Sequence, residues 1–137
     1  MPRYVAERIL LAPLDDVWRF VSEPYHLSDW WPGISGVEPD RRGMAAGARW
    51  KVQGPGFLRK PETERVLLVR EVHPMERVSF ELPSQRIAVV LELRATDADR
   101  TSATVEVEGR FLFGPGSTVG KQALARLYDL VQTAAER

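Results

Sequence analysis

Few residues of this 137-residue chain are of types that do chemistry, and their spacing narrows the possibilities further. There is no cysteine, which removes a thiol nucleophile, a thiolate zinc site and a disulfide framework. The two histidines, His26 and His73, lie far apart and form no HxH or HxxxH spacing, so we expect no metal site. No serine stands in a GxSxG motif, and a serine nucleophile therefore has no support.

Charged and phenolic side chains remain as candidates for an interior or its rim. An arginine can polarise a carbonyl, and a glutamate or tyrosine can accept a proton, so an Arg–Tyr or Arg–Glu pair could perform both tasks. His26 could act as a general base or a pH-sensitive gate, against the plainer interpretation of a surface histidine. Solvation is the competing interpretation for the charged groups, because charged strand residues usually face water. The candidates are Tyr4, Arg8, Arg70, Glu71 and Tyr128.

Two adjacent tryptophans, Trp30 and Trp31, precede Pro32-Gly33 in the stretch HLSDWWPGISGV. They could form a corner plug between a helix and a strand, one wall of a ligand pocket, or an exposed recognition patch. Successive residues of a helix point about 100° apart, so both rings should not face the core equally. We expect one to pack and the other to line a pocket mouth. Trp18, on an apolar helix face, is expected in the core.

The pattern of apolar residues and chain breakers predicts an α+β domain. A strand over residues 3–11 ends at Ala12-Pro13, a short helix covers residues 13–22, and a second begins at Pro24 and ends at Pro32-Gly33. Beyond residue 33 the apolar period becomes two and predicts an antiparallel meander. A long amphipathic helix, capped by Ser117 or Thr118, closes the chain.

Alternation assigns one face of the meander to the interior and a charged face to solvent. Residues 62–73 resist the assignment because four apolar residues follow one another, so we expect a bulge or an edge covered on both sides there; the face of Arg70 stays open. Core and pocket wall are equally open interpretations for the inward side chains. Those inward candidates are Trp50, Phe80, Leu91, Val107, Phe111, Leu124 and Leu127.

The stretch LLAPLDDVWRFVSEPYHLSDWWPGISGVE resembles the SRPBCC, or START-like helix-grip, superfamily, which has the fold of the birch pollen allergen. Within it the chain is similar to polyketide cyclase/dehydrase-type bacterial proteins. The likeness covers the whole chain, residues 1–137, as a single domain. It implies a curved antiparallel sheet of six to seven strands around the long C-terminal helix, with a cavity between them for lipids or polyketides.

Three functions follow as expectations. The first is binding of a small hydrophobic or aromatic molecule, lipid- or polyketide-like, in that cavity; the second is a cofactor-independent aromatase/cyclase or dehydratase; the third is a protein-interaction module with a closed core. Nineteen basic residues balance nineteen acidic ones, so we expect neither nucleic acid nor an anionic membrane as partner. No membrane-length apolar run or signal peptide is visible, which predicts a cytoplasmic protein. We expect no cofactor, and a homodimer is possible.

Overall fold

The computed structural model describes residues 3–109 and 118–135, and its elements follow the predicted order. The strands are β1 (Arg3–Leu10), β2 (Gly36–Glu38), β3 (Arg49–Gln53), β4 (Val66–His73), β5 (Arg77–Leu82), β6 (Ile87–Asp97) and β7 (Arg100–Gly109). The α-helices are α1 (Leu14–Val21), α2 (Leu27–Trp30) and α3 (Val119–Ala135), and the short 3-10 turns are η1 (Pro24–His26), η2 (Pro55–Phe57), η3 (Glu62–Glu64) and η4 (Pro83–Gln85).

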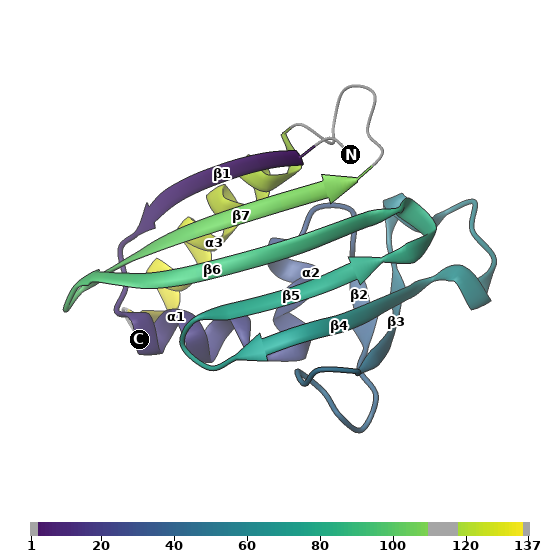
Figure 1. Cartoon of the computed structure of the whole chain (residues 1–137), viewed down its shortest axis with the longest axis horizontal. Helices are drawn as coiled ribbons and strands as arrows, with labels where there is room; N and C mark the ends of the chain where they lie inside the picture. Colours follow the sequence, from purple (N-terminus) through teal and green to yellow (C-terminus); the bar gives the residue numbers. More distant parts are fainter. Residues whose placement is uncertain (1–2, 110–117, 136–137) are drawn as a thin grey trace.

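The seven strands form one sheet in the order β1-β7-β6-β5-β4-β3-β2, and every neighbouring pair is antiparallel. The first strand thus lies beside the last, while the five between them follow a simple meander. The three α-helices lie behind the sheet in the view of Figure 1. α3 packs on β1 and β7, and α1 and α2 pack against α3. The predicted helix-grip α+β fold is confirmed.

Local sequence accounts for where the helices begin. Pro13 precedes α1, and its carbonyl accepts the first helical hydrogen bond from the Val17 N–H at 3.0 Å. Asp15 and Asp16 stand in the first turn, where negative charge favours the helix dipole. At α3 the Thr118 carbonyl accepts the Gln122 N–H at 3.0 Å, while Ser117 lies outside the described residues.

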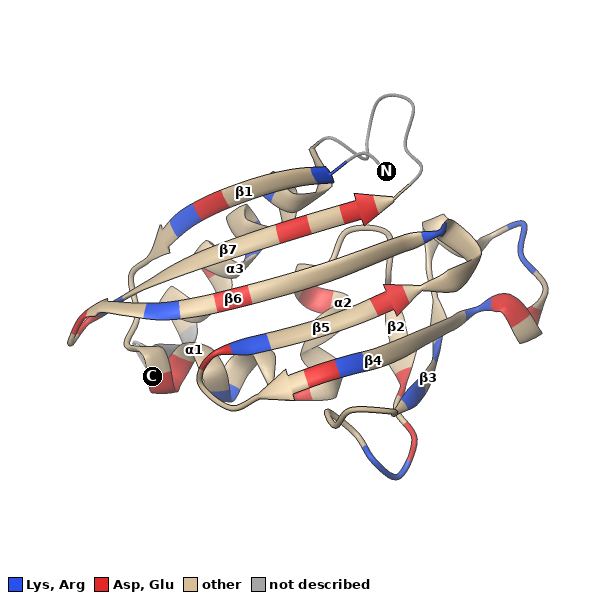
Figure 2. Ribbon diagram, in the orientation of Figure 1, with Lys and Arg blue, Asp and Glu red and all other residues tan. Residues whose placement is uncertain are grey.

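The two faces of the sheet differ as the alternation predicts. Inward residues such as Val78, Phe80 and Leu82 on β5 are buried, and their neighbours Arg77 and Glu81 point outward. Figure 2 shows acidic and basic residues interspersed along the strands of the outer face. The inner face therefore supplies the core, and the outer face is mostly wet.

β4 contains the irregularity that its sequence predicts. The register with β5 shifts between Val69, opposite Phe80, and Glu71, opposite Ser79. The extra residue is Arg70, so the bulge comes after the apolar run rather than within it. Leu67 and Val69 face the core. The bulge settles the face of Arg70, which lies on the outer face beside Glu81.

Candidate functional site

Three aromatic rings meet on the inner side of the sheet, where α2 reaches β5. Trp31 and Phe80 contact edge to face, with ring centroids 5.4 Å apart and planes at 89°. Trp30 stands 5.9 Å from Trp31 and 6.4 Å from Phe80, again nearly perpendicular to both. Perpendicular rings place positive edges against negative faces, which stabilises such a group beyond its buried area. We call Trp30, Trp31 and Phe80 the aromatic cluster.

The expectation that the two tryptophans would not face the core equally is wrong. Each is only 1% exposed. The reason is that Trp31 is no longer helical: it is the C-cap of α2, with φ −91° and ψ 120°. Because the backbone of Trp31 is extended, the 100° rotation between successive helical residues does not apply to its side chain, and both indoles can face the core.

The buried indoles differ in how their N–H groups are satisfied. Trp50, also 1% exposed, donates its Nε1–H to the Gly43 carbonyl at 2.9 Å. Trp30 Nε1 is buried and has no hydrogen-bond partner among the described residues. A buried donor without a partner costs on the order of 1–3 kcal/mol. Trp18, expected in the core, is half-buried and packs against its margin.

The other apolar candidates lie where their spacing predicts, between the sheet and α3. Leu91 and Val107 come from β6 and β7, and Leu124 and Leu127 from α3; each is at most 2% exposed. Side chains so fully covered leave no room for a water-sized void against them. The space that these described residues enclose is therefore filled by protein atoms. Phe111 lies outside the described residues.

Of the polar candidates, the structure brings Arg8 and Tyr128 together. Arg8 is opposite Ala103 in the β1–β7 register, on the inner face, and its guanidinium carbon lies 4.2 Å from the centre of the Tyr128 ring. This is a cation–π contact between β1 and α3. Tyr4, half-buried, is opposite Val107 on the same inner side.

Arg70 and Glu71 lie on the outer face and do not line the space between the sheet and α3. Arg70 Nε is 3.2 Å from Glu81 Oε1, and Glu71 Oε2 is 3.2 Å from Arg77 Nη1. Both positions follow from the bulge, which puts Arg70 and Glu71 on the same side of β4. His73 completes this outer cluster, with Nε2 3.6 Å from Glu71 Oε2.

His26 is half-buried at the end of η1, and its ring contacts Phe20 rather than the aromatic cluster. Its Nδ1 lies 2.8 Å from the Phe20 carbonyl, and its ring stacks on Phe20 with centroids 4.1 Å apart. Because a carbonyl only accepts, this contact requires a proton on Nδ1. Across residues 3–109 and 118–135, no three His, Cys, Asp or Glu side chains are grouped as a metal would need.

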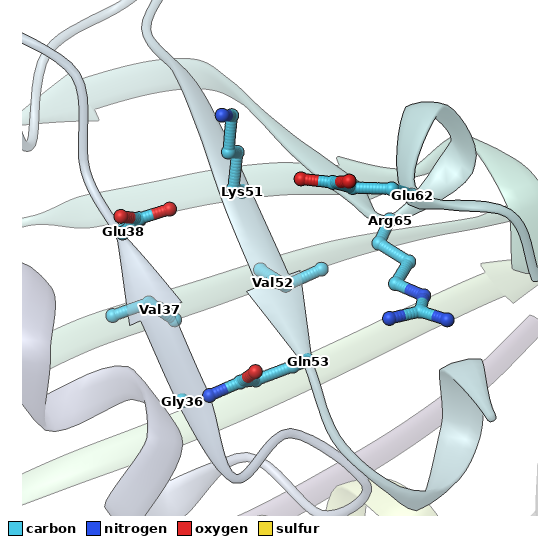
Figure 3. A pocket seen from close by; sticks show the side chains of 8 residues that line it. All are labelled: Gly36, Val37, Glu38, Lys51, Val52, Gln53, Glu62 and Arg65. Carbon is cyan, nitrogen blue, oxygen red and sulfur yellow. The ribbon is translucent and has the colours of Figure 1, made fainter.

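A surface groove that the sequence did not predict lies at the β2–β3 edge, with a volume of about 370 Å³ (Figure 3). Two carboxylates, Glu38 and Glu62, and two cations, Lys51 and Arg65, border it. They come from β2, β3 and the segment around η3, so only the fold brings them together. Their mixed charge selects no single class of ligand.

The chain matches the family model described as polyketide cyclase / dehydrase and lipid transport over residues 1–134. The chain belongs to this family. No curated protein sequence matches it. Among the described residues, no helix is both long and apolar enough to cross a membrane.

Solved structures with a similar fold share little sequence with this family member. A protein from Nitrosospira multiformis is 16% identical with a TM-score of 0.72, and the match covers 99% of this chain and 100% of that one. The di-domain ARO/CYC BexL from the BE-7585A biosynthetic pathway is 18% identical with a TM-score of 0.68, covering 96% of this chain and 47% of BexL. DynU16, from the dynemicin biosynthetic locus, is 21% identical with a TM-score of 0.62, covering 97% and 48%. At these identities the likeness establishes the fold alone.

Proposed function

We propose that the protein binds a small hydrophobic or aromatic molecule between the sheet and α3, against the aromatic cluster. The observation that carries the proposal is the indole N–H of Trp30, a buried donor with no described partner amid apolar rings. A ligand oxygen that accepts this hydrogen bond would remove its desolvation penalty. The preferred ligand is then largely apolar, with an aromatic part and one carbonyl or ether oxygen. Membership in a family of polyketide and lipid proteins supports the same class.

Binding at this place requires the interior to open, because the side chains around the aromatic cluster are fully packed. α2 is the smallest of the α-helices that pack over the sheet here. It is a single turn of four residues, and Pro32-Gly33 follows directly after its C-cap, Trp31. A displacement of this turn would expose Trp30 and Trp31 without disturbing the strand pairing. Since the open state is a minor one, its population reduces the apparent affinity for any ligand.

The first experiment is to ask what the purified protein carries. Organic extraction followed by mass spectrometry, beside native mass spectrometry of the intact protein, should reveal a stoichiometric apolar adduct. That adduct then serves as the probe for titration against Trp30→Phe and Trp31→Phe. Both variants lose indole volume beside the ligand, but Trp30→Phe also removes the proposed donor, so it should bind the adduct about tenfold more weakly than Trp31→Phe. Equal affinities would refute the donor role.

A second candidate is a cofactor-independent aromatase/cyclase, and the Arg8–Tyr128 pair favours it. Arg8 is exposed, although the β1 register puts it on the inner face, and its permanent cation lies 4.2 Å from the ring of the half-buried Tyr128, whose phenol can transfer a proton. Turnover of a poly-β-carbonyl substrate by the wild type, lost in Arg8→Gln and in Tyr128→Phe while substrate binding persists, would support cyclisation. Substrate bound and released unchanged by the wild type would leave the carrier function.

A further inference from the structure

The outer face of the sheet holds a hollow, on the opposite side of the sheet from the aromatic cluster. It is a groove of about 670 Å³ bordered by β3, β4, η3 and η4, and we call it the outer groove. Its floor includes Val66 and Leu68, the two outward members of the apolar run of β4. Both are half-buried, and they lie beside charged outward residues such as Arg70 and Glu81. The apolar run thus serves two surfaces: its inward members belong to the core and its outward members to this groove.

Three cationic side chains border the outer groove: Arg49 from β3, Lys60 from the segment before η3, and Arg86 from the end of η4. None of their charged groups lies within 4.0 Å of a carboxylate among the described residues. Glu64 is the single acidic residue that lines the groove. Three cations against one carboxylate make a local excess of positive charge on a chain whose formal charges cancel.

Two further features lie at η4. Ser84 lines the groove, but its hydroxyl is shielded from solvent and has no hydrogen-bond partner among the described residues. A serine hydroxyl needs only a χ1 rotation to present its proton elsewhere. Two residues later, Arg86 is the C-cap of η4 and has φ 57°, the left-handed conformation that glycine adopts most easily. An arginine at this position keeps its charge over the groove at a conformational cost.

We propose that the outer groove binds an amphiphilic anion: a carboxylate or phosphate head group on a short apolar chain. Arginine matches the geometry of both oxyanions, Lys60 adds charge, and the rotated Ser84 hydroxyl can donate to the head group. The apolar chain covers Val66 and Leu68. A neutral ligand would leave the cations unused, and a cationic one would be repelled. The site is separate from the proposed interior site.

The test is an NMR titration of the isotope-labelled full chain with hexanoate and with hexyl phosphate, using hexyltrimethylammonium as the charge-reversed control. Both anions should shift the Val66 and Leu68 methyl signals, and the cation should not. The anion that binds more tightly identifies the preferred head group. Anion-induced shifts confined to other regions, or equal shifts from the cation, would overturn the proposal.

Variants test whether the cationic side chains of the outer groove contact the bound anion. Arg86→Gly removes the charge at a position whose φ glycine accepts, so the fold is not at risk, and it should weaken anion binding about tenfold. Arg94→Gln, which changes an exposed arginine on the outer face of β6 away from the groove, is the matched control and should bind as the wild type does. Trp30→Phe should also leave this binding unchanged, which separates the outer groove from the interior site. An unaltered affinity in Arg86→Gly would refute the proposal.

Discussion

The indole N–H of Trp50 donates to the Gly43 carbonyl at 2.9 Å, whereas the equally buried indole N–H of Trp30 has no acceptor among the described residues. The two side chains therefore bury similar apolar surface, but their N–H groups affect the free energy of unfolding in opposite directions. A hydrogen bond stabilises the fold at Trp50, and an unmet donor destabilises it at Trp30. The fold retains a less stable arrangement at Trp30, beside the rings of Trp31 and Phe80, and this is the basis of the proposed ligand contact.

A pair of phenylalanine substitutions measures this difference. Both Trp30→Phe and Trp50→Phe lose part of an indole, so their costs in packing should be similar. Trp50→Phe also loses a hydrogen bond, and Trp30→Phe removes an unsatisfied donor. We expect Trp50→Phe to be less stable than Trp30→Phe by about 1–3 kcal/mol in urea unfolding of the ligand-free protein. The reverse order would show that Trp30 Nε1 is satisfied in solution.

A hydrogen bond from a buried threonine on β7 links this strand to the segment that follows β1. Thr101 is fully buried, and its Oγ1–H donates to the Ala12 carbonyl at 2.9 Å. Thr101→Val keeps the shape but leaves that buried carbonyl without its donor, so we expect the free energy of unfolding to fall by about 1–3 kcal/mol. Thr104→Val, a half-buried outer-face position on the same strand, is the control and should stay within about 0.5 kcal/mol of the wild type. Equal effects would mean that this hydrogen bond contributes nothing measurable.

Sequence periodicity predicted the element order and the faces of β5, β6 and β7, because a half-buried strand must alternate. It did not predict local departures from regular geometry. Trp31 was expected to follow helical directions, but it is the residue at which α2 ends. Arg70 could not be assigned because its face depends on a bulge whose exact position requires the register with β5.

The site residues show a similar division. The burial of Trp50, Leu91 and Leu127 follows from their own strands and helix. The outer groove and the groove at the β2–β3 edge could not be predicted in this way, because each combines side chains from segments separated by loops. Lys60 and Arg86, for example, are distant in sequence and border the same hollow only after β4, β5 and η4 have folded.

Gly54 lies where the segment after β3 crosses the Pro32-Gly33 corner that follows Trp31. Its φ is +151°, and an added Cβ would stand 2.3 Å from the Gly33 carbonyl oxygen and 2.7 Å from the Ser35 nitrogen. Both neighbours are backbone atoms, so the crossing itself must move. We expect Gly54→Ala to cost about 3 kcal/mol or more, from overpacking together with backbone strain.

Gly33→Ala is the matched control for this crossing. Gly33 has φ +89°, but an added Cβ would find its nearest neighbour, the Gly56 nitrogen, at an ordinary 4.0 Å. Gly33→Ala should lower the free energy of unfolding by only about 1–2 kcal/mol, the strain of a non-glycine residue in this backbone conformation. Thermal unfolding of both variants compares them directly, and a Gly54→Ala protein as stable as Gly33→Ala would show that the two segments separate easily.

Asp40 gives the fold a defined acid dependence. Its carboxylate accepts the backbone N–H of Arg49 and that of Arg42, each at 2.9 Å, and the bond from Arg49 is the main cause that holds the pKa of Asp40 below its ordinary value of 3.8. A lowered pKa in the folded state stabilises the fold above the unfolded pKa, and this stabilisation is lost as the pH falls through the folded value.

Asp40→Asn should therefore be less stable than the wild type at about pH 7, and the difference in their free energies of unfolding should narrow as the pH falls below about 4. Urea unfolding across this range measures the difference in stability, with Asp99→Asn in the β6–β7 turn as the control for losing one exposed acid. A carbon-13 NMR titration of the Asp40 carboxyl should have its midpoint below 3.8. A midpoint above that value would contradict the role of the two N–H donors.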